Sequence, residues 1–273
     1  MTHANALTDP YALALNRARA APDALFLQEI ARDDVHDRLE LVNKTFQSPA
    51  VVTAFPHIWE GAIADAAVFP ETETLPLTTG GHDAVIHSMG LHWANDPVGQ
   101  LIQCRRALKP DGLLLAVALG GQTLFELRAA LAEAEIAVCG GLSPRVAPMG
   151  EVRDLGGLLQ RAGLALPVAD TVPLRVQYAS MWHLMRDLRA MGEANALTSR
   201  LRRPTRRAVF ERAADIYARA YPADSGDGII ATYELILLTG WAPDDSQQKP
   251  LRPGSAQARL ADALHTDETS LPD

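Results

Sequence analysis

Three histidines, His82, His87 and His92, are the first side chains in this sequence that suggest chemistry, and they lie five residues apart. A metal ion would require their rings to converge. A spacing of five across a strand and its following turn does not place side chains on one face. No cysteine or glutamate ligands accompany them in a zinc-binding pattern. We therefore predict no metal site.

His87 and Ser88 also end an apolar segment, residues 83–88, that lies between glycine-containing turns. This pattern predicts a short buried strand. Sheets of α/β proteins bind ligands at the carboxyl ends of their strands, so His87 and Ser88 are candidate ligand-binding residues. Simple packing of His87 in the core is the alternative. No Ser-His-Asp order or paired carboxylates stand out, so hydrolysis is not predicted.

A β-α-β unit positions these residues. Asp96 and Pro97 are typical of an N-cap and a first helical residue. The continuous apolar run 113–119 is typical of a strand buried on both faces of a parallel sheet. We predict that strands 83–88 and 113–119 are parallel, with helix 97–108 crossing between them.

Several longer motifs surround this unit. They are LHWANDP, RRALKPDGLLLA, GGQTLFELRAALAEAE, LSPRVAPM, DLGGLLQRAG, MRDLRAMGEANAL and GWAPDDSQQKPLRPGSA. The LHW turn and the LKPDG helix end resemble the second half of a class I S-adenosylmethionine-dependent methyltransferase domain. With the later motifs, the sequence resembles bacterial relatives of a mitochondrial complex I assembly factor, which is described as an arginine hydroxylase on a methyltransferase fold. The malonyl-carrier-protein methyltransferases of biotin synthesis are more distant. The resemblance covers roughly residues 11–265.

The resemblance implies an α/β fold class: a truncated Rossmann-like class I methyltransferase sheet, with helices on both faces and a C-terminal helical insertion. The insertion is expected between the strands of an antiparallel hairpin at one sheet edge. The expected organisation is an N-terminal tail (1–22), a methyltransferase-like α/β core (23–178), a helical insertion (179–222), the last sheet strand (223–245) and a C-terminal tail (246–273).

The resemblance also implies S-adenosylmethionine as cofactor, bound after a first strand at residues 50–54. In the family, a glycine-rich turn lets this cofactor approach the backbone. Here the segment reads TAFPHIWEG, which lacks those glycines and the acidic residue. We predict that Phe55, Pro56 or Trp59 fills part of the cofactor volume, and that the following helix shrinks to a loop or one turn. By position, Ala54 and Phe55 are cofactor-binding candidates.

Glu71 and Thr72 open the segment ETETLPL, which matches the family segment whose acidic residue and next amide contact adenine. The alternative is a solvated turn. Between the first two strands there is no room for the usual strand and helix that carry the ribose-binding acid. The complete set of predicted cofactor-binding residues is Ala54, Phe55, Glu71, Thr72, His87 and Ser88; the catalytic residues are unknown.

Composition narrows the possible partners. The formal net charge of −8 argues against nucleic-acid binding. An arginine cluster at 200–207 is the local exception, either as a solvated helix junction or as a docking patch for an acidic partner.

No apolar run is long enough to span a bilayer, and the N-terminus lacks a signal-peptide pattern. The two cysteines form no disulfide framework, so we expect a cytoplasmic protein.

Two functions remain open. The first is an S-adenosylmethionine-dependent methyltransferase-family protein with a degenerate cofactor turn. The second is a non-catalytic methyltransferase-like assembly or interaction factor for a respiratory complex. Both allow a protein partner or substrate, and neither fixes the oligomeric state. The altered turn after the first strand is the feature that discriminates between them.

Overall fold

The computed structural model of this protein describes residues 6–224, 226–248 and 266. The chain divides into one unit of residues 1–243 and a second of residues 244–273. The sheet, its helices and the two cavities described below all belong to the first unit. The expected C-terminal tail, with the motif at 249–255, lies almost wholly outside the described residues.

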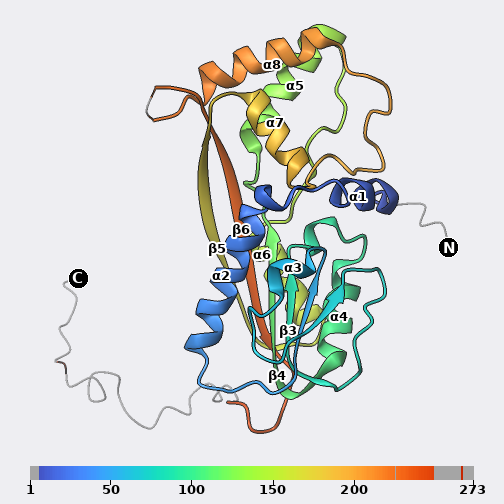
Figure 1. The fold of residues 1–273 in the computed structure, drawn as a ribbon, viewed down its shortest axis with the longest axis vertical. Coiled ribbons are helices and arrows are strands. Elements are labelled where there is room, and N and C mark those ends of the chain that lie inside the picture. Colours follow the sequence, from blue (N-terminus) through green and yellow to red (C-terminus); the bar gives the residue numbers. More distant parts are fainter. Residues whose placement is uncertain (1–5, 225, 249–265, 267–273) are drawn as a thin grey trace, which may run out of the picture. The chain divides into compact units, whose positions relative to one another are not determined.

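A mixed six-stranded sheet forms the centre of the first unit, in the order β2-β1-β3-β4-β6-β5 (Figure 1). The strands are β1 (Pro49–Thr53), β2 (Ala67–Pro70), β3 (His82–Ser88), β4 (Leu108–Leu119), β5 (Ala165–Tyr178) and β6 (Ile229–Trp241). The first four are parallel, and β6 is antiparallel to both β4 and β5. The predicted fold class and the parallel β-α-β unit are thereby confirmed.

Helices cover both faces of this sheet. They are α1 (Pro10–Arg17), α2 (Phe26–Leu41), α3 (Pro56–Trp59), α4 (Pro97–Ala107), α5 (Phe125–Cys139), α6 (Val152–Arg161), α7 (Met181–Ala190) and α8 (Arg207–Ala220), with 3₁₀ turns at Pro22–Ala24 and Leu91–Trp93. Alternate β4 residues enter opposite cores, since Leu115 packs in the cluster of α2 and α5, and Leu114 in that of α4 and α6. This two-sided burial explains the continuous apolar run of β4.

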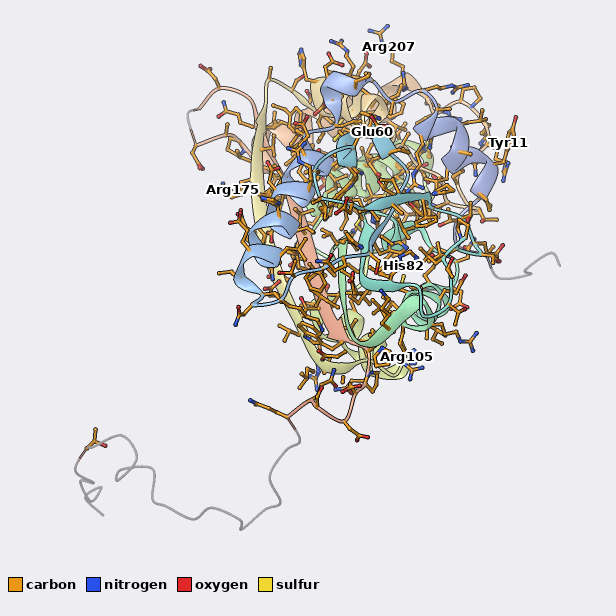
Figure 2. The ribbon with its side chains drawn as sticks, turned by 60° about the horizontal axis from the view of Figure 1, so that its bottom comes forward. Tyr11, Glu60, His82, Arg105, Arg175 and Arg207 are labelled. Carbon is orange, nitrogen blue, oxygen red and sulfur yellow. The ribbon has the colours of Figure 1, made fainter. Side chains whose placement is uncertain are left out.

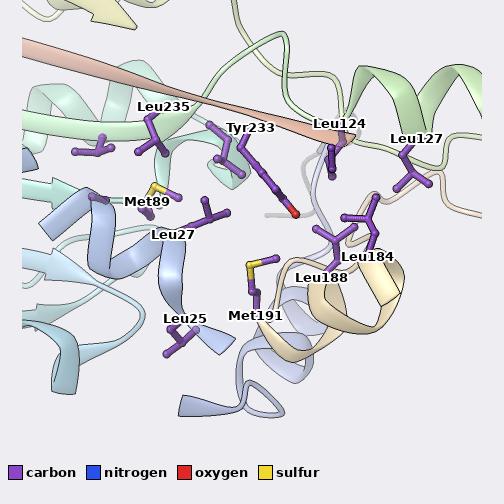
Figure 3. Close-up of a cluster of buried hydrophobic side chains, with 14 of the residues drawn as sticks. Leu25, Leu27, Met89, Leu124, Leu127, Leu184, Leu188, Met191, Tyr233 and Leu235 are labelled. Atoms are coloured by element: carbon purple, nitrogen blue, oxygen red, sulfur yellow. The ribbon is translucent and has the colours of Figure 1, made fainter. Parts of the chain in front are cut away.

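The long β5–β6 hairpin extends beyond the parallel strands, and α7 and α8 lie between its strands in sequence (Figure 1). Figure 3 shows the hydrophobic core between the hairpin and the helices. In this core, leucines of α7 and of the α5 region lie beside Tyr233 of β6. Helix α5 packs against α8. Helices α5, α7 and α8, which we call the helical layer, therefore lie next to the carboxyl ends of the parallel strands (Figure 1).

Some element bounds differ from those expected from the sequence. The apolar segment 63–69 predicts the second strand, whereas β2 spans Ala67–Pro70. The patterns at 164–170 and 173–178 predict two strands, which form one strand, β5. Pro173 does not interrupt β5, because β5 is the edge strand of the sheet and pairs only with β6. The helical pattern expected over 179–220 forms α7 and α8, with irregular backbone between them.

The segment expected as an N-terminal tail contains α1. Asp9 caps this helix by accepting hydrogen bonds from the amides of Tyr11 and Ala12, and Pro10 occupies the first turn. These are ordinary helix-start signals. Ala12 and Leu13 are buried, so tertiary contacts hold α1 in place.

Candidate functional site

A cavity of about 570 Å³ lies at the carboxyl ends of β1 and β2. Its lining comes from the ends of these strands, the start of α4 and one side of α1; it comprises Thr8, Pro10, Leu13, Ala14, Arg17, Thr53, Ala54, Pro56, Pro70–Glu73, Trp93–Asp96, Gly99, Gln100 and Gln103. We call it the strand-end cavity. Its position and volume are those of a small-molecule site in an open α/β sheet.

An ion pair crosses the wall of the strand-end cavity. Arg17 Nη1 of α1 lies 2.9 Å from Glu71 Oε2 after β2, and the two side chains are only 12% and 10% exposed. The Glu71 carboxylate sits directly over Gly90, where an added Cβ would come within 2.3 Å of its carbon. Arg17 Nε is buried without a hydrogen-bond partner, whereas Glu71 Oε2 faces Arg17 Nη1 in the ion pair.

Helix α4 fixes the segment that follows β2. Gln100 Nε2 donates to the carbonyls of Thr72 and Glu73, at 2.9 and 3.0 Å. Its Oε1 accepts from His87 Nε2 at 3.2 Å. His87 is fully buried beneath Gln100, and this burial lowers its pKa below the ordinary value. Through Gln100, His87 therefore helps to position Thr72 and Glu73 in the cavity wall.

Helix α1 closes one side of the cavity and is tied to the segment after α7. The Asp9 amide donates to the Ala196 carbonyl at 2.8 Å, and Asp9 also pairs with Arg200 at 2.9 Å. Asn95 holds Thr8 through both its amide oxygen and its amide nitrogen. The position of α1 is thus coupled to the helical layer.

The turn after β1 leaves the cavity open. Ala54 and Pro56 line it, whereas the side chains of Phe55 and Trp59 are 5% and 1% exposed in the hydrophobic core. The helix after this turn is the four-residue α3, so the predicted reduction to a single turn is confirmed. Of the three bulky residues expected to fill the cofactor volume, only Pro56 lines the cavity.

A second cavity, of about 210 Å³, lies between β6 and the helical layer. It is lined by Trp93, Leu119, Leu124, Leu127, Leu131, Arg145–Ala147, Met149, Met185, Leu188, Arg189, Glu193–Asn195, Phe210 and Tyr233. We call it the insertion cavity. Trp93 lines both cavities, so this residue is common to their walls.

A buried carboxylate, Glu193, is one of the polar groups of the insertion cavity, beside Arg145, Arg189 and Asn195. Glu193 Oε2 accepts from Trp93 Nε1 at 2.7 Å and from His92 Nε2 at 3.3 Å, while its Oε1 has no hydrogen-bond partner. Burial would raise the pKa of Glu193, but the hydrogen bonds from His92 and Trp93 and the nearby Arg17 charge bring it below its ordinary value. Glu193 is therefore ionised at neutral pH and can accept from a cation.

The structure brings three of the six predicted cofactor-binding residues to the strand-end cavity: Ala54, Glu71 and Thr72. The other three do not line it. Phe55 packs in the core, and His87 and Ser88 are buried below the surface of the cavity. The cofactor-binding role of the three lining residues stays a prediction.

Sequence reasoning missed Arg17, Trp93 and Glu193 as members of the site. A tryptophan in such a turn is typical of an anchor that holds its loop on the core, and Trp93 is 4% exposed. Its motif, LHW, was the available signal. Arg17 and Glu193 gave no local signal, because their partners lie far away in the sequence.

Metal ligands and membrane spans were also sought among the described residues. No three histidine, cysteine, aspartate or glutamate side chains there come together in a way that could hold a metal ion. None of the described helices is both long and apolar enough to cross a membrane.

Comparisons with known proteins give consistent relatives. A family model described as "Methyltransferase domain" matches residues 9–116. The "Arginine-hydroxylase NDUFAF5, mitochondrial" of Danio rerio is 36% identical over 230 residues, which are 83% of this chain and 70% of the relative. The Rattus norvegicus protein of the same name is 38% identical, over 86% and 68% of the two chains. A "Malonyl-[acyl-carrier protein] O-methyltransferase" of Laribacter hongkongensis is 36% identical, over 71% and 62%.

The sheet order and the domain match define a protein of the S-adenosylmethionine-dependent methyltransferase class, with a Rossmann-like sheet and a cavity at its strand ends. Within this class, the chain belongs to the family of the mitochondrial arginine-hydroxylase NDUFAF5. The resemblance inferred from the LHW and LKPDG motifs is thus confirmed.

Proposed function

We propose that this protein binds S-adenosylmethionine in the strand-end cavity and holds a side chain of a protein partner in the insertion cavity. The observation that carries the proposal is Trp93, a residue that lines both cavities. A ligand in each would face the other across one side chain.

The strand-end cavity offers a fit for the adenosine portion of the cofactor. Glu71 supplies an acceptor for an exocyclic amine, and the cavity also has space beside Ala54. Pro56 removes an amide donor that a glycine-rich turn would give, so α1 and α4 supply the remaining lining. When bound, S-adenosylmethionine supplies a methyl group already activated by its sulfonium.

The insertion cavity suits a long side chain that carries a positive charge. Most of its lining is apolar, the charge of Arg145 is paired with Glu135, and Arg189 is exposed to solvent. The buried Glu193 carboxylate can therefore offer a charge-assisted hydrogen bond. The relatives named arginine-hydroxylase suggest arginine as this side chain. We extend that suggestion to the present chain as part of the proposal.

Glu71→Gln should weaken S-adenosylmethionine binding about tenfold to a hundredfold, because a buried hydrogen bond to a charged group contributes about 1–3 kcal/mol. Glu60→Gln is the matched control, since it removes an exposed carboxylate that lies outside the cavity lining. Calorimetric titration of both variants is the measurement. Loss of affinity in the Glu71 variant alone supports adenine recognition by Glu71. Equal losses would contradict that role.

A non-catalytic assembly or interaction factor is the second candidate. One observation favours it: the turn after β1 contains Pro56 and lacks the glycines that bring a cofactor close to the backbone. In that case the Arg17–Glu71 pair is a structural link between α1 and the sheet. Absence of S-adenosylmethionine binding in the wild type would favour this function.

A further inference from the structure

The helical insertion differs in charge from the rest of the chain. Residues 179–220 contain nine arginines and four acidic residues, whereas the whole chain has a net charge of −8. The insertion therefore carries a surplus of positive charge on an acidic protein. Such an asymmetry guides the approach of partners.

Part of this charge has a structural role. Arg200 and Arg202 both reach Asp9, at 2.9 and 3.3 Å, and so attach α1 to the insertion. Arg207 pairs with Glu211 within α8, but its side chain remains 89% exposed. It projects away from α8 (Figure 2). The other arginines of α7 and of the start of α8 are exposed.

An aromatic pair of an exposed tryptophan and a half-buried phenylalanine lies among these arginines. Trp182 is 43% exposed, and its ring centroid lies 6.0 Å from that of Phe210 on α8. Residues spaced three and four apart share one side of a helix. By that spacing, the set comprises Trp182, Arg186 and Arg189 on α7, Arg207 and Phe210 on α8, and Arg206, the residue that precedes α8. We call this set the insertion patch.

The insertion patch borders the insertion cavity. Arg189 and Phe210 belong to the lining of that cavity as well as to the patch. A partner seated on the patch is therefore placed to extend one side chain towards Glu193. Tryptophan and arginine are also the residues that most often dominate the binding energy of protein interfaces.

We propose that the insertion patch docks an acidic segment of the protein partner whose target side chain enters the insertion cavity. Entry of the target side chain into the insertion cavity rests on the proposed function, whereas docking of the acidic segment does not. Arginine guanidinium groups bind carboxylates in a bidentate geometry, which fits an acidic segment. A lipid surface fits less well, because the apolar side of α7 (Met181, Leu184 and Leu188) is buried in the protein core.

Three labelled peptides of equal length test this proposal by fluorescence anisotropy. The first has a central arginine between glutamate-rich flanks, the second replaces every glutamate by glutamine, and the third keeps the acidic flanks around a central alanine. The full-length variants are Trp182→Ala and the double change Arg206→Glu with Arg207→Glu. Arg153→Glu, an exposed change on α6, is the matched control.

The acidic arginine peptide should bind the wild type at least about tenfold more tightly than the glutamine peptide, with a preference that weakens in high salt. Both patch variants should lose at least about tenfold in affinity, and Arg153→Glu should not. Equal binding of acidic and neutral peptides, or no binding of the acidic peptide, overturns the proposal. Patch-dependent binding to phosphatidylglycerol vesicles without a peptide preference also overturns it and identifies a lipid surface.

The alanine peptide separates docking on the insertion patch from entry of a side chain into the insertion cavity. If it binds as tightly as the arginine peptide and depends on the patch, docking stands and the role of the insertion cavity in the proposed function fails. If the arginine peptide binds more tightly, both stand.

Discussion

Glu193→Gln should weaken binding of the acidic arginine peptide about tenfold to a hundredfold, because a hydrogen bond to a buried charged group contributes about 1.5–3 kcal/mol. The glutamine oxygen can still accept from Trp93, so the cavity wall keeps its partner. The variant removes only the negative charge that faces the cavity.

Asp215→Asn, an exposed change on α8, is the control for this experiment. It removes one negative charge from the insertion without altering the cavity, and it should leave peptide affinity nearly unchanged. Binding of the alanine peptide should not respond to Glu193→Gln. An equal loss for both peptides would contradict a direct contact between Glu193 and the arginine side chain.

Glu135→Gln should lower the free energy of unfolding by about 3 kcal/mol at neutral pH. Glu135 on α5 is 7% exposed and accepts hydrogen bonds from Ser143 and Arg145, which also reaches Thr205. Burial would raise the pKa of Glu135, but Arg145 and Ser143 lower it to about 2, from an ordinary value of 4.5. Arg145 lines the insertion cavity, so this cluster supports its wall.

The sign of the pH dependence follows from the lowered pKa. Glu135 stabilises the fold fully above pH 4.5, and this contribution declines as the pH falls towards about 2. Urea unfolding should therefore show a wild-type advantage at neutral pH that shrinks at about pH 3. Glu133→Gln, an exposed neighbour on the same helix, should change stability by less than about 0.5 kcal/mol. A pH-independent difference for Glu135→Gln would contradict the account.

The fold followed from local patterns where those patterns were strong. The apolar run of β4 and the Asp96–Pro97 helix start placed the β-α-β unit, and both signals act over a few residues. The same kind of signal, Asp9 followed by Pro10, also begins α1. It was overlooked because an amphipathic pattern of only eight residues is weak evidence for a helix.

The site was predictable only in part, for a physical reason. Glu71 was found because its segment keeps a family pattern, but its buried contact with Arg17 joins segments that only the folded sheet brings together. Phe55 was expected at the cofactor and instead packs in the core. The local backbone of a turn decides which side chain points inward, and composition does not encode that direction.

Calorimetric titration of the wild-type protein with S-adenosylmethionine tests the central claim most directly. Ala14→Trp on the exposed side of α1 would fill the strand-end cavity, whereas Leu15→Trp on the same helix lies outside its lining and is the control. We predict saturable one-site binding by the wild type and by Leu15→Trp, and none by Ala14→Trp. No heat of binding by the wild type at about millimolar ligand, or undiminished binding by Ala14→Trp, would contradict a cofactor in the strand-end cavity.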